Sequence, residues 1–121
     1  MDAKASVLIV EDEAALAELF EIWLADRYAL ETVTAGADAI ERIDDGFDAV
    51  VLDWRMPDVS GEAVLEHVRT EDLAVRVVVV TGMELVVEDV EGEADAVLRK
   101  PVSADELVST VEELLAGPGP A

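Results

Sequence analysis

Four short apolar runs divide this chain, and each run leads to polar residues that phosphate chemistry can use. The runs and the residues that follow them are 7–10 with Glu11 and Asp12, 49–52 with Asp53, 77–80 with Thr81, and 96–98 with Arg99 and Lys100. Short apolar runs of this kind are typical of buried strands in a parallel sheet. The carboxyl ends of parallel strands share one edge, where open α/β sheets bind ligands. We therefore expect these polar groups to converge.

Amphipathic segments alternate with the strand-like runs. Apolar side chains at three- and four-residue spacing predict helices over 13–27, 36–43, 61–69 and from Ser103 onward. Ser103 and Glu106 have the spacing of a capping box. Residues 28–33 indicate another short strand, whereas 84–92 fit either a short helix or an irregular loop. The alternation predicts a doubly wound α/β domain of five strand–helix units, with a parallel sheet and right-handed crossovers.

The first predicted helix illustrates how the inward face is chosen from this spacing. Its apolar positions, which we expect to face the core, are Leu16, Leu19, Phe20, Trp23 and Leu24.

Only 4% of the residues in the chain are aromatic, although 52% are hydrophobic. The core must therefore be built mainly from aliphatic side chains.

The charge of the chain is strongly unbalanced. Asp and Glu total 29 and Lys and Arg total 8, which gives a formal net charge of −21. Repulsion on this scale destabilises a compact state, but Debye screening shortens to about 3 Å at 1 M salt. We predict a halophilic protein that melts at a higher temperature in molar KCl than in dilute buffer. A thermal melt that is unchanged between the two would contradict this prediction.

The same acidity restricts how motifs and partners are interpreted. Nucleic-acid binding requires a basic face, so direct contact with nucleic acid by this segment is not expected. Neighbouring acids are common by chance in such a chain, and we interpret pairs such as Asp44 and Asp45 as solvated. Glu11 and Asp12 differ because they directly follow a buried-looking strand.

Length and composition limit the class of protein. The 121 residues suit one domain, which we place at 1–116, followed by a Gly/Pro linker or tail at 117–121. There is no cysteine, so disulfides and thiolate metal sites are excluded. The first residues do not resemble a signal peptide, and no apolar run approaches membrane-spanning length. We expect a cytoplasmic protein without membrane contact.

The side chains at the predicted sheet edge form a chemically coherent set. Three carboxylates without His or Cys favour a hard cation, and Mg²⁺ accepts such ligands while retaining several waters. An Asp carboxylate can act as a nucleophile toward phosphorus and form an aspartyl phosphate. A lysine places positive charge on phosphate, and a threonine hydroxyl can donate to a phosphoryl oxygen. These are the parts of a phosphoacceptor site.

Over about residues 5–116, the chain resembles a known family, the receiver domains of two-component response regulators. The matching pieces are Val7-Leu-Ile-Val-Glu-Asp-Glu13, Leu52-Asp-Trp-Arg-Met-Pro-Asp-Val-Ser-Gly61, Thr81 after a valine strand, and Lys100-Pro101. Each piece is weak alone, but the set in this order and spacing is highly specific. The resemblance implies a flavodoxin-like (βα)5 fold with a five-stranded parallel sheet in the order 2-1-3-4-5.

The resemblance also implies roles for individual residues. Asp53 would accept a phosphoryl group from a sensor histidine kinase, and Thr81 and Lys100 would bind the phosphoryl oxygens. The implied Mg²⁺ ligands are Glu11, Asp12, Asp53 and the backbone carbonyl of Arg55. The peptide bond between Lys100 and Pro101 would be cis. Such a protein catalyses only its own phosphorylation and dephosphorylation and is not otherwise an enzyme.

Three features depart from the family pattern. Val97 occupies the switch position at which the family usually has Tyr or Phe, so coupling between that position and Thr81 is in doubt. Only 19 positions (100 − 81) separate Thr81 from Lys100, and the deficit falls on the fourth helix. The last predicted helix has no Lys or Arg. The downstream effector stays unidentified, and a homodimer stays an open alternative.

Two other functions compete with the phosphorylation-controlled switch. The valine at position 97 motivates a receiver-like module that binds its partner independently of phosphorylation. A Mg²⁺-dependent phosphohydrolase with an Asp nucleophile would usually need a second acid two residues after Asp53. Arg55 occupies that position, which disfavours the hydrolase.

Overall fold

The computed structural model of the protein describes residues 4–82 and 94–116. Its elements are β1 (Ser6–Val10), α1 (Ala14–Leu24), β2 (Ala29–Val33), α2 (Gly36–Arg42), β3 (Ala49–Asp53), α3 (Gly61–Thr70), β4 (Arg76–Thr81), β5 (Ala96–Arg99) and α5 (Ala104–Leu115). The predictions for 84–92 and 117–121, and for the length of the fourth helix, lie outside the described residues. None of the helices within these ranges is long and apolar enough to cross a membrane.

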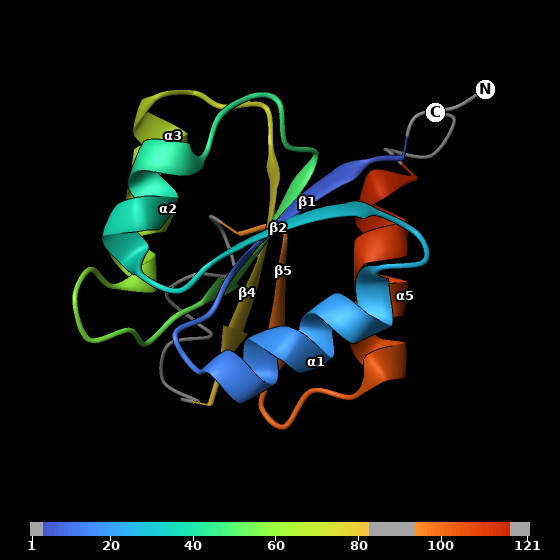
Figure 1. The fold of residues 1–121 in the computed structure, drawn as a ribbon. Helices are drawn as coiled ribbons and strands as arrows, with labels where there is room; N and C mark the ends of the chain where they lie inside the picture. The colour runs from blue at the N-terminus through green and yellow to red at the C-terminus, as the bar shows by residue number, and fades with distance from the viewer. Residues whose placement is uncertain (1–3, 83–93, 117–121) are drawn as a thin grey trace.

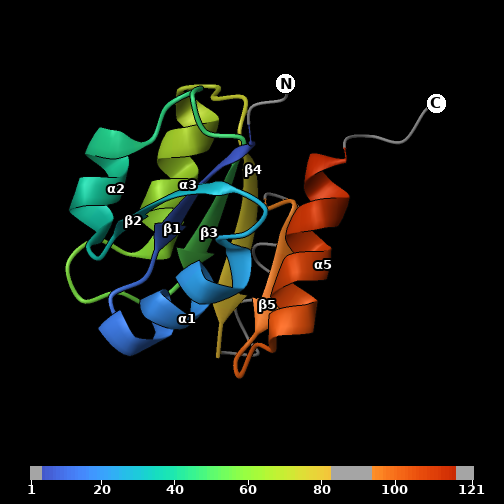
Figure 2. The ribbon, with the colours of Figure 1, turned by 45° about the vertical axis from the view of Figure 1, so that its right-hand side comes forward.

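The strands form one five-stranded sheet in the order β2-β1-β3-β4-β5, and every neighbouring pair is parallel. Helices α1 and α5 pack together on one face, and α2 and α3 pack together on the other (Figures 1 and 2). The doubly wound fold and the strand order expected from the sequence are therefore confirmed. The predicted capping box at the start of α5 is also present, between Ser103 and Glu106.

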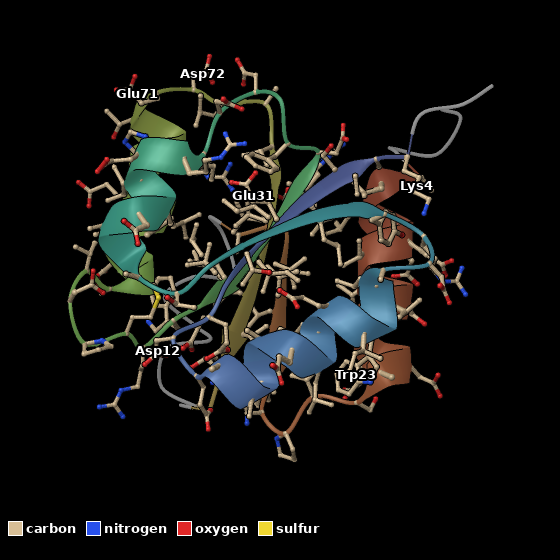
Figure 3. The ribbon with its side chains drawn as sticks, viewed as in Figure 1. Lys4, Asp12, Trp23, Glu31, Glu71 and Asp72 are labelled. Atoms are coloured by element: carbon tan, nitrogen blue, oxygen red, sulfur yellow. The ribbon has the colours of Figure 1, made fainter. Side chains whose placement is uncertain are left out.

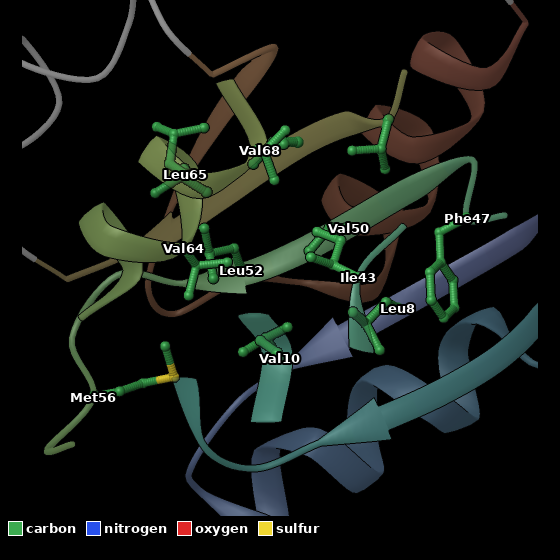
Figure 4. Packing of buried hydrophobic residues seen from close by; sticks show 14 residues of the cluster. Leu8, Val10, Ile43, Phe47, Val50, Leu52, Met56, Val64, Leu65 and Val68 are labelled. Atoms are coloured by element: carbon green, nitrogen blue, oxygen red, sulfur yellow. The ribbon is translucent and has the colours of Figure 1, made fainter. Parts of the chain in front are cut away.

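The valine run of β4 supplies side chains to both faces of the sheet. Val77 and Val79 pack in the cluster beneath α2 and α3, whereas Val78 and Val80 pack in the cluster beneath α1 and α5. All four are fully buried. Figure 4 shows the first cluster, in which Phe47 and Met56 close the two ends of an otherwise aliphatic core. A central strand buried on both faces explains why this run lacks polar alternation.

Helix α1 corrects one prediction about its inward face. Leu19 is 43% exposed and Ile22 is 68% exposed, so the expectation that Leu19 faces the core is wrong. The buried positions are Ala17, Phe20 and Leu24. The small Ala17 takes an inward position, and successive residues point about 100° apart around a helix. Leu19 therefore points away from the face that Phe20 presents to the sheet.

The same helix is shorter than the predicted range 13–27. It ends at Leu24, whose carbonyl accepts hydrogen bonds from Arg27 N and Tyr28 N, both at 3.1 Å. This turn directs the Tyr28 side chain into the core, where it is 9% exposed. The chain then enters β2 at Ala29 rather than at the predicted residue 28.

Several aspartates bind backbone amides at the amino ends of the strands, opposite the predicted site. Asp48 Oδ2 accepts from Ser6 N at 2.8 Å, and Asp45 Oδ1 accepts from Ala74 N at 2.7 Å. Asp95 Oδ2 likewise accepts from Val77 N at 2.7 Å. Asp45 is exposed, as expected, and its carboxylate also accepts a hydrogen bond from an amide just before β4. These hydrogen bonds provide acceptors for backbone amides at or near the starts of strands, where the sheet's own backbone hydrogen bonds do not supply them.

Candidate functional site

The carboxyl edge of the sheet brings three carboxylates together. Glu11 and Asp12 follow β1, and Asp53 ends β3, which is the strand next to β1. One oxygen from each carboxylate lies within 4.8 Å of the others. Figure 3 shows Asp12 beside the start of α1. A cleft of about 380 Å³ opens here and is lined by Asp12, Glu13, Asp53, Arg55, Gly82 and Lys100. The predicted convergence at one sheet edge is thus observed.

Glu11 lies beneath the cleft and is fully buried. Its Oε2 accepts a hydrogen bond from Glu13 N at 3.2 Å. Its Oε1 is buried without a hydrogen-bond partner among the described residues, and Lys100 Nζ lies 3.6 Å from it. Burial raises the pKa of the Glu11 carboxyl, while the Glu13 amide and the Lys100 charge oppose that rise. A buried carboxylate oxygen with unused acceptor capacity is suited to a cation.

Asp53 lies at the floor of the cleft, with 3% of its surface exposed. Its Oδ1 accepts a hydrogen bond from Arg55 N at 3.4 Å and lies 3.4 Å from Lys100 Nζ. Burial, followed by its hydrogen bond with Asp12 and the charge of Glu11, raises the pKa of Asp53 to about 7. Lys100 offsets only part of this effect. The cluster therefore carries more negative charge than its own lysine neutralises.

The chain geometry around Lys100 explains how the lysine reaches the acids. β4 and β5 pair with Thr81 opposite Arg99, and Lys100 N donates to Thr81 O at 2.9 Å. The peptide bond between Lys100 and Pro101 is cis, the isomer that the resemblance implies. Lys100 Nζ thus lies between Glu11 and Asp53, and Thr81 is buried at the end of β4.

The other predicted positions lie at different depths. Arg55 is exposed and lines the cleft, so its side chain borders the entrance while its amide contacts Asp53. Val97, on β5, pairs with Val79 of β4. It is partly buried and packs against the cluster beneath α2 and α3. Val97 therefore contributes an aliphatic contact to the core at the predicted switch position.

Asp58 was not among the predicted site residues. Its Oδ1 accepts from Gly36 N at 3.2 Å and its Oδ2 accepts from Ala37 N at 3.1 Å, at the start of α2. Hydrogen bonds from the backbone amides of Val59 and Ala37 lower the pKa of this carboxyl. Its place after Pro57 in a predicted loop is typical of a turn, but no local signal identified α2 as the partner.

Gly61 was likewise predicted only as the start of α3. A Cβ atom built on it would lie 2.6 Å from Asp53 O and 2.7 Å from Trp54 Cα. Its amide donates to Trp54 O at 2.9 Å. The missing side chain at position 61 therefore allows α3 to begin directly against the peptide that carries Asp53.

The comparisons with known proteins agree with this geometry. Residues 7–112 match the model of the response regulator receiver domain family. The chain belongs to this family. Receiver domains are phosphoacceptors of two-component signalling rather than classical enzymes. The identity of this domain thus rests on a match that covers most of the chain together with the acidic cleft.

Two relatives place the receiver domain in longer proteins. It is 45% identical over 118 residues to a Haloferax volcanii protein that bears the name of a transcriptional regulator. This match covers 97% of the present chain and 20% of that protein. It is 36% identical over 110 residues to the transcriptional regulatory protein DltR of Streptococcus agalactiae, which covers 87% of this chain and 49% of DltR. The chain spans half or less of the length of these relatives.

A solved structure shows the same fold with a relevant ligand. The response regulator TrrA of Thermotoga maritima, crystallised in complex with Mg²⁺ and BeF, is 27% identical and superposes with a TM-score of 0.82. The match covers 91% of this chain and 98% of TrrA. It supports the assignment of the receiver fold to this sequence.

Proposed function

We propose that this receiver domain is a phosphorylation-controlled switch whose phosphoacceptor is Asp53. The observation that carries the proposal is the Asp53 carboxylate at the floor of the acidic cleft, 3.4 Å from Lys100 Nζ. In the reaction, a carboxylate oxygen of Asp53 forms a bond to phosphorus as the bond between phosphorus and the kinase histidine breaks. The electron pair of the broken bond goes to the imidazole nitrogen.

The acidic cluster supports a divalent cation in this reaction. Glu11, Asp12, Asp53 and the backbone carbonyl of Arg55 would hold Mg²⁺, which fits an all-oxygen donor set that includes a buried Oε1 without a hydrogen-bond partner. When bound, the ion supplies positive charge that stabilises the phosphoryl oxygens. The crystal structure of TrrA with Mg²⁺ and BeF favours the same cation here.

Thr81 and Lys100 complete the proposed site on its other side. Lys100 would bind a phosphoryl oxygen through its ammonium group, and the Thr81 hydroxyl would donate to another. Lys100 is already aligned with Asp53, so positive charge faces the position at which phosphoryl charge accumulates. Arg55 borders the same cleft and would influence the access of water to the acyl phosphate.

The partners of the domain follow from its place in signalling. We propose a sensor histidine kinase as the phosphoryl donor and an output domain or separate effector as the recipient of the signal. The longer relatives that bear the names of transcriptional regulators favour an output connected to transcription. We place the receiver domain at residues 1–116 and assign 117–121 as a linker or tail.

Intact mass after incubation with Mg²⁺ and acetyl phosphate in molar KCl tests the proposal. We expect one phosphoryl adduct on the wild type and none on Asp53→Asn, because the amide is not a nucleophile toward phosphorus. Asp48→Asn is the matched control, since Asp48 lies at the opposite end of the strands, and it should be labelled like the wild type. An adduct that persists in Asp53→Asn would refute the assignment.

The same experiment addresses the alternative of a module that acts without phosphorylation. Val97 packs as an ordinary aliphatic side chain and offers no hydroxyl or aromatic ring at the predicted switch position. A folded wild-type protein that gains no adduct from either acetyl phosphate or a histidine kinase would favour this alternative. Partner affinity that is equal before and after labelling would favour it as well.

A further inference from the structure

The segment 54–60 packs at its beginning against the peptide that carries Asp53. Asp53 Oδ1 accepts from Arg55 N at 3.4 Å, and Gly61 N donates to Trp54 O at 2.9 Å. A Cβ on Gly61 would lie 2.6 Å from Asp53 O, so the end of the segment returns to within contact of its start. Movement of the Asp53 peptide and movement of this segment are therefore mechanically linked.

The far part of the same segment contacts the first turn of α2. The Asp58 carboxylate accepts hydrogen bonds from Gly36 N at 3.2 Å and from Ala37 N at 3.1 Å. A Cβ on Gly36 would lie 2.1 Å from Val59 O, an approach that only glycine permits. Asp58 and Val59 thus join α2 to the segment by both hydrogen bonds and close packing.

Phosphorylation would alter the first contact in this series. The Asp53 carboxylate that accepts from Arg55 N would become an acyl phosphate, which places further negative charge beside that amide. The segment is short and is hydrogen-bonded at both ends. We therefore expect a displacement of the Arg55 backbone to displace Asp58 as well. Packed contacts of this kind transmit small displacements because they do not deform continuously.

We propose that Asp58 is a positioning residue that couples the phosphoacceptor site to the first turn of α2. The inference rests on the proposed function, since it takes Asp53 as the phosphorylated residue. Coupling between two sites is reciprocal. A loosened contact at Asp58 therefore changes the affinity of the Asp53 site for a phosphoryl mimic, and occupancy of the Asp53 site changes the environment of Gly36 and Ala37.

Amide NMR spectra of the labelled protein in molar KCl, with and without Mg²⁺ and beryllofluoride, test the coupling. In the wild type we expect the resonances of Gly36 and Ala37 to shift together with those of Arg55. In Asp58→Ala the Arg55 shift should persist, the α2 shifts should fall below half of their wild-type size, and the affinity for the mimic should change by at least about fivefold. Asp58→Asn, which retains one acceptor oxygen, should be intermediate.

Asp38→Asn is the matched control, because Asp38 is an exposed acid in the first turn of the same helix. It should behave like the wild type in both shifts and affinity. The coupling is refuted if Arg55 responds to the mimic but Gly36 and Ala37 do not, or if Asp58→Ala retains the full response. If Arg55 itself does not respond, the proposed phosphoacceptor function fails and the coupling fails with it.

Discussion

In the absence of divalent cations, Asp53→Asn is expected to be more stable than the wild type at pH 7, by up to about 4 kcal/mol. Burial and the neighbouring acids raise the pKa of Asp53 from 3.8 to about 7 in the folded protein. Between these two values the folded state binds more protons than the unfolded state. The stability of the wild type therefore falls as pH rises through this window, and the uncharged asparagine removes that loss.

Urea unfolding at pH 4 and pH 7, in molar KCl with a chelator, measures this effect. The two proteins should have similar free energies of unfolding at pH 4, where Asp53 is protonated in the folded state and about half protonated in the unfolded state, and should diverge at pH 7. Excess Mg²⁺ should raise the stability of the wild type more than that of Asp53→Asn. An Asp53→Asn protein that is less stable than the wild type at pH 7 without metal would contradict the electrostatic account.

Gly61→Ala is expected to destabilise the domain by about 2–3 kcal/mol and to remove labelling by acetyl phosphate. The added Cβ would lie 2.6 Å from Asp53 O and 2.7 Å from Trp54 Cα, and both of these atoms belong to the backbone. Neither can rotate away, so α3 or the Asp53 peptide must shift. A shift of that peptide would move the Asp53 carboxylate relative to Lys100, so the groups that react with acetyl phosphate would no longer be aligned.

Gly82→Ala provides the matched control for this substitution. A Cβ on Gly82 meets no atom of residues 4–82 or 94–116 within 4 Å, although Gly82 lines the same cleft. This variant should keep wild-type stability to within about 0.5 kcal/mol and should still be labelled. Thermal melting and intact mass on the three proteins distinguish the outcomes. Equal effects of the two substitutions would show that the close approach at Gly61 is not the cause.

Much of the fold and the site could be predicted because their signals are local. Buried parallel strands need apolar runs, so β1, β3, β4 and β5 stand out from the amphipathic segments between them. Polar residues directly after such runs must meet at one sheet edge, which predicted the neighbourhood of Glu11, Asp12, Asp53 and Lys100. The order of the strands came from the family resemblance, since periodicity alone does not determine which strands pair.

Other features could not be predicted because they depend on tertiary contacts. The apolar spacing of α1 placed Leu19 inward, yet the rotation of the helix is decided by the sheet and α5, and Ala17 takes that side. Asp58 and Asp48 are two acids among 29, and nothing local distinguishes an acid that binds a backbone amide from one that faces water. The depth of Glu11 beneath the cleft is also a tertiary property.

The aspartate bonds at the amino ends of the strands limit how this protein can be redesigned for dilute buffers. Replacing acids with neutral residues would reduce self-repulsion, but replacing Asp45, Asp48 or Asp95 with a residue that has no acceptor oxygen would remove the side-chain acceptor of an amide at or just before the start of a strand. A variant designed to fold at low salt should instead replace exposed helix acids such as Glu18 and Glu66. The acidic composition thus contains two populations, one exchangeable and one that belongs to the architecture.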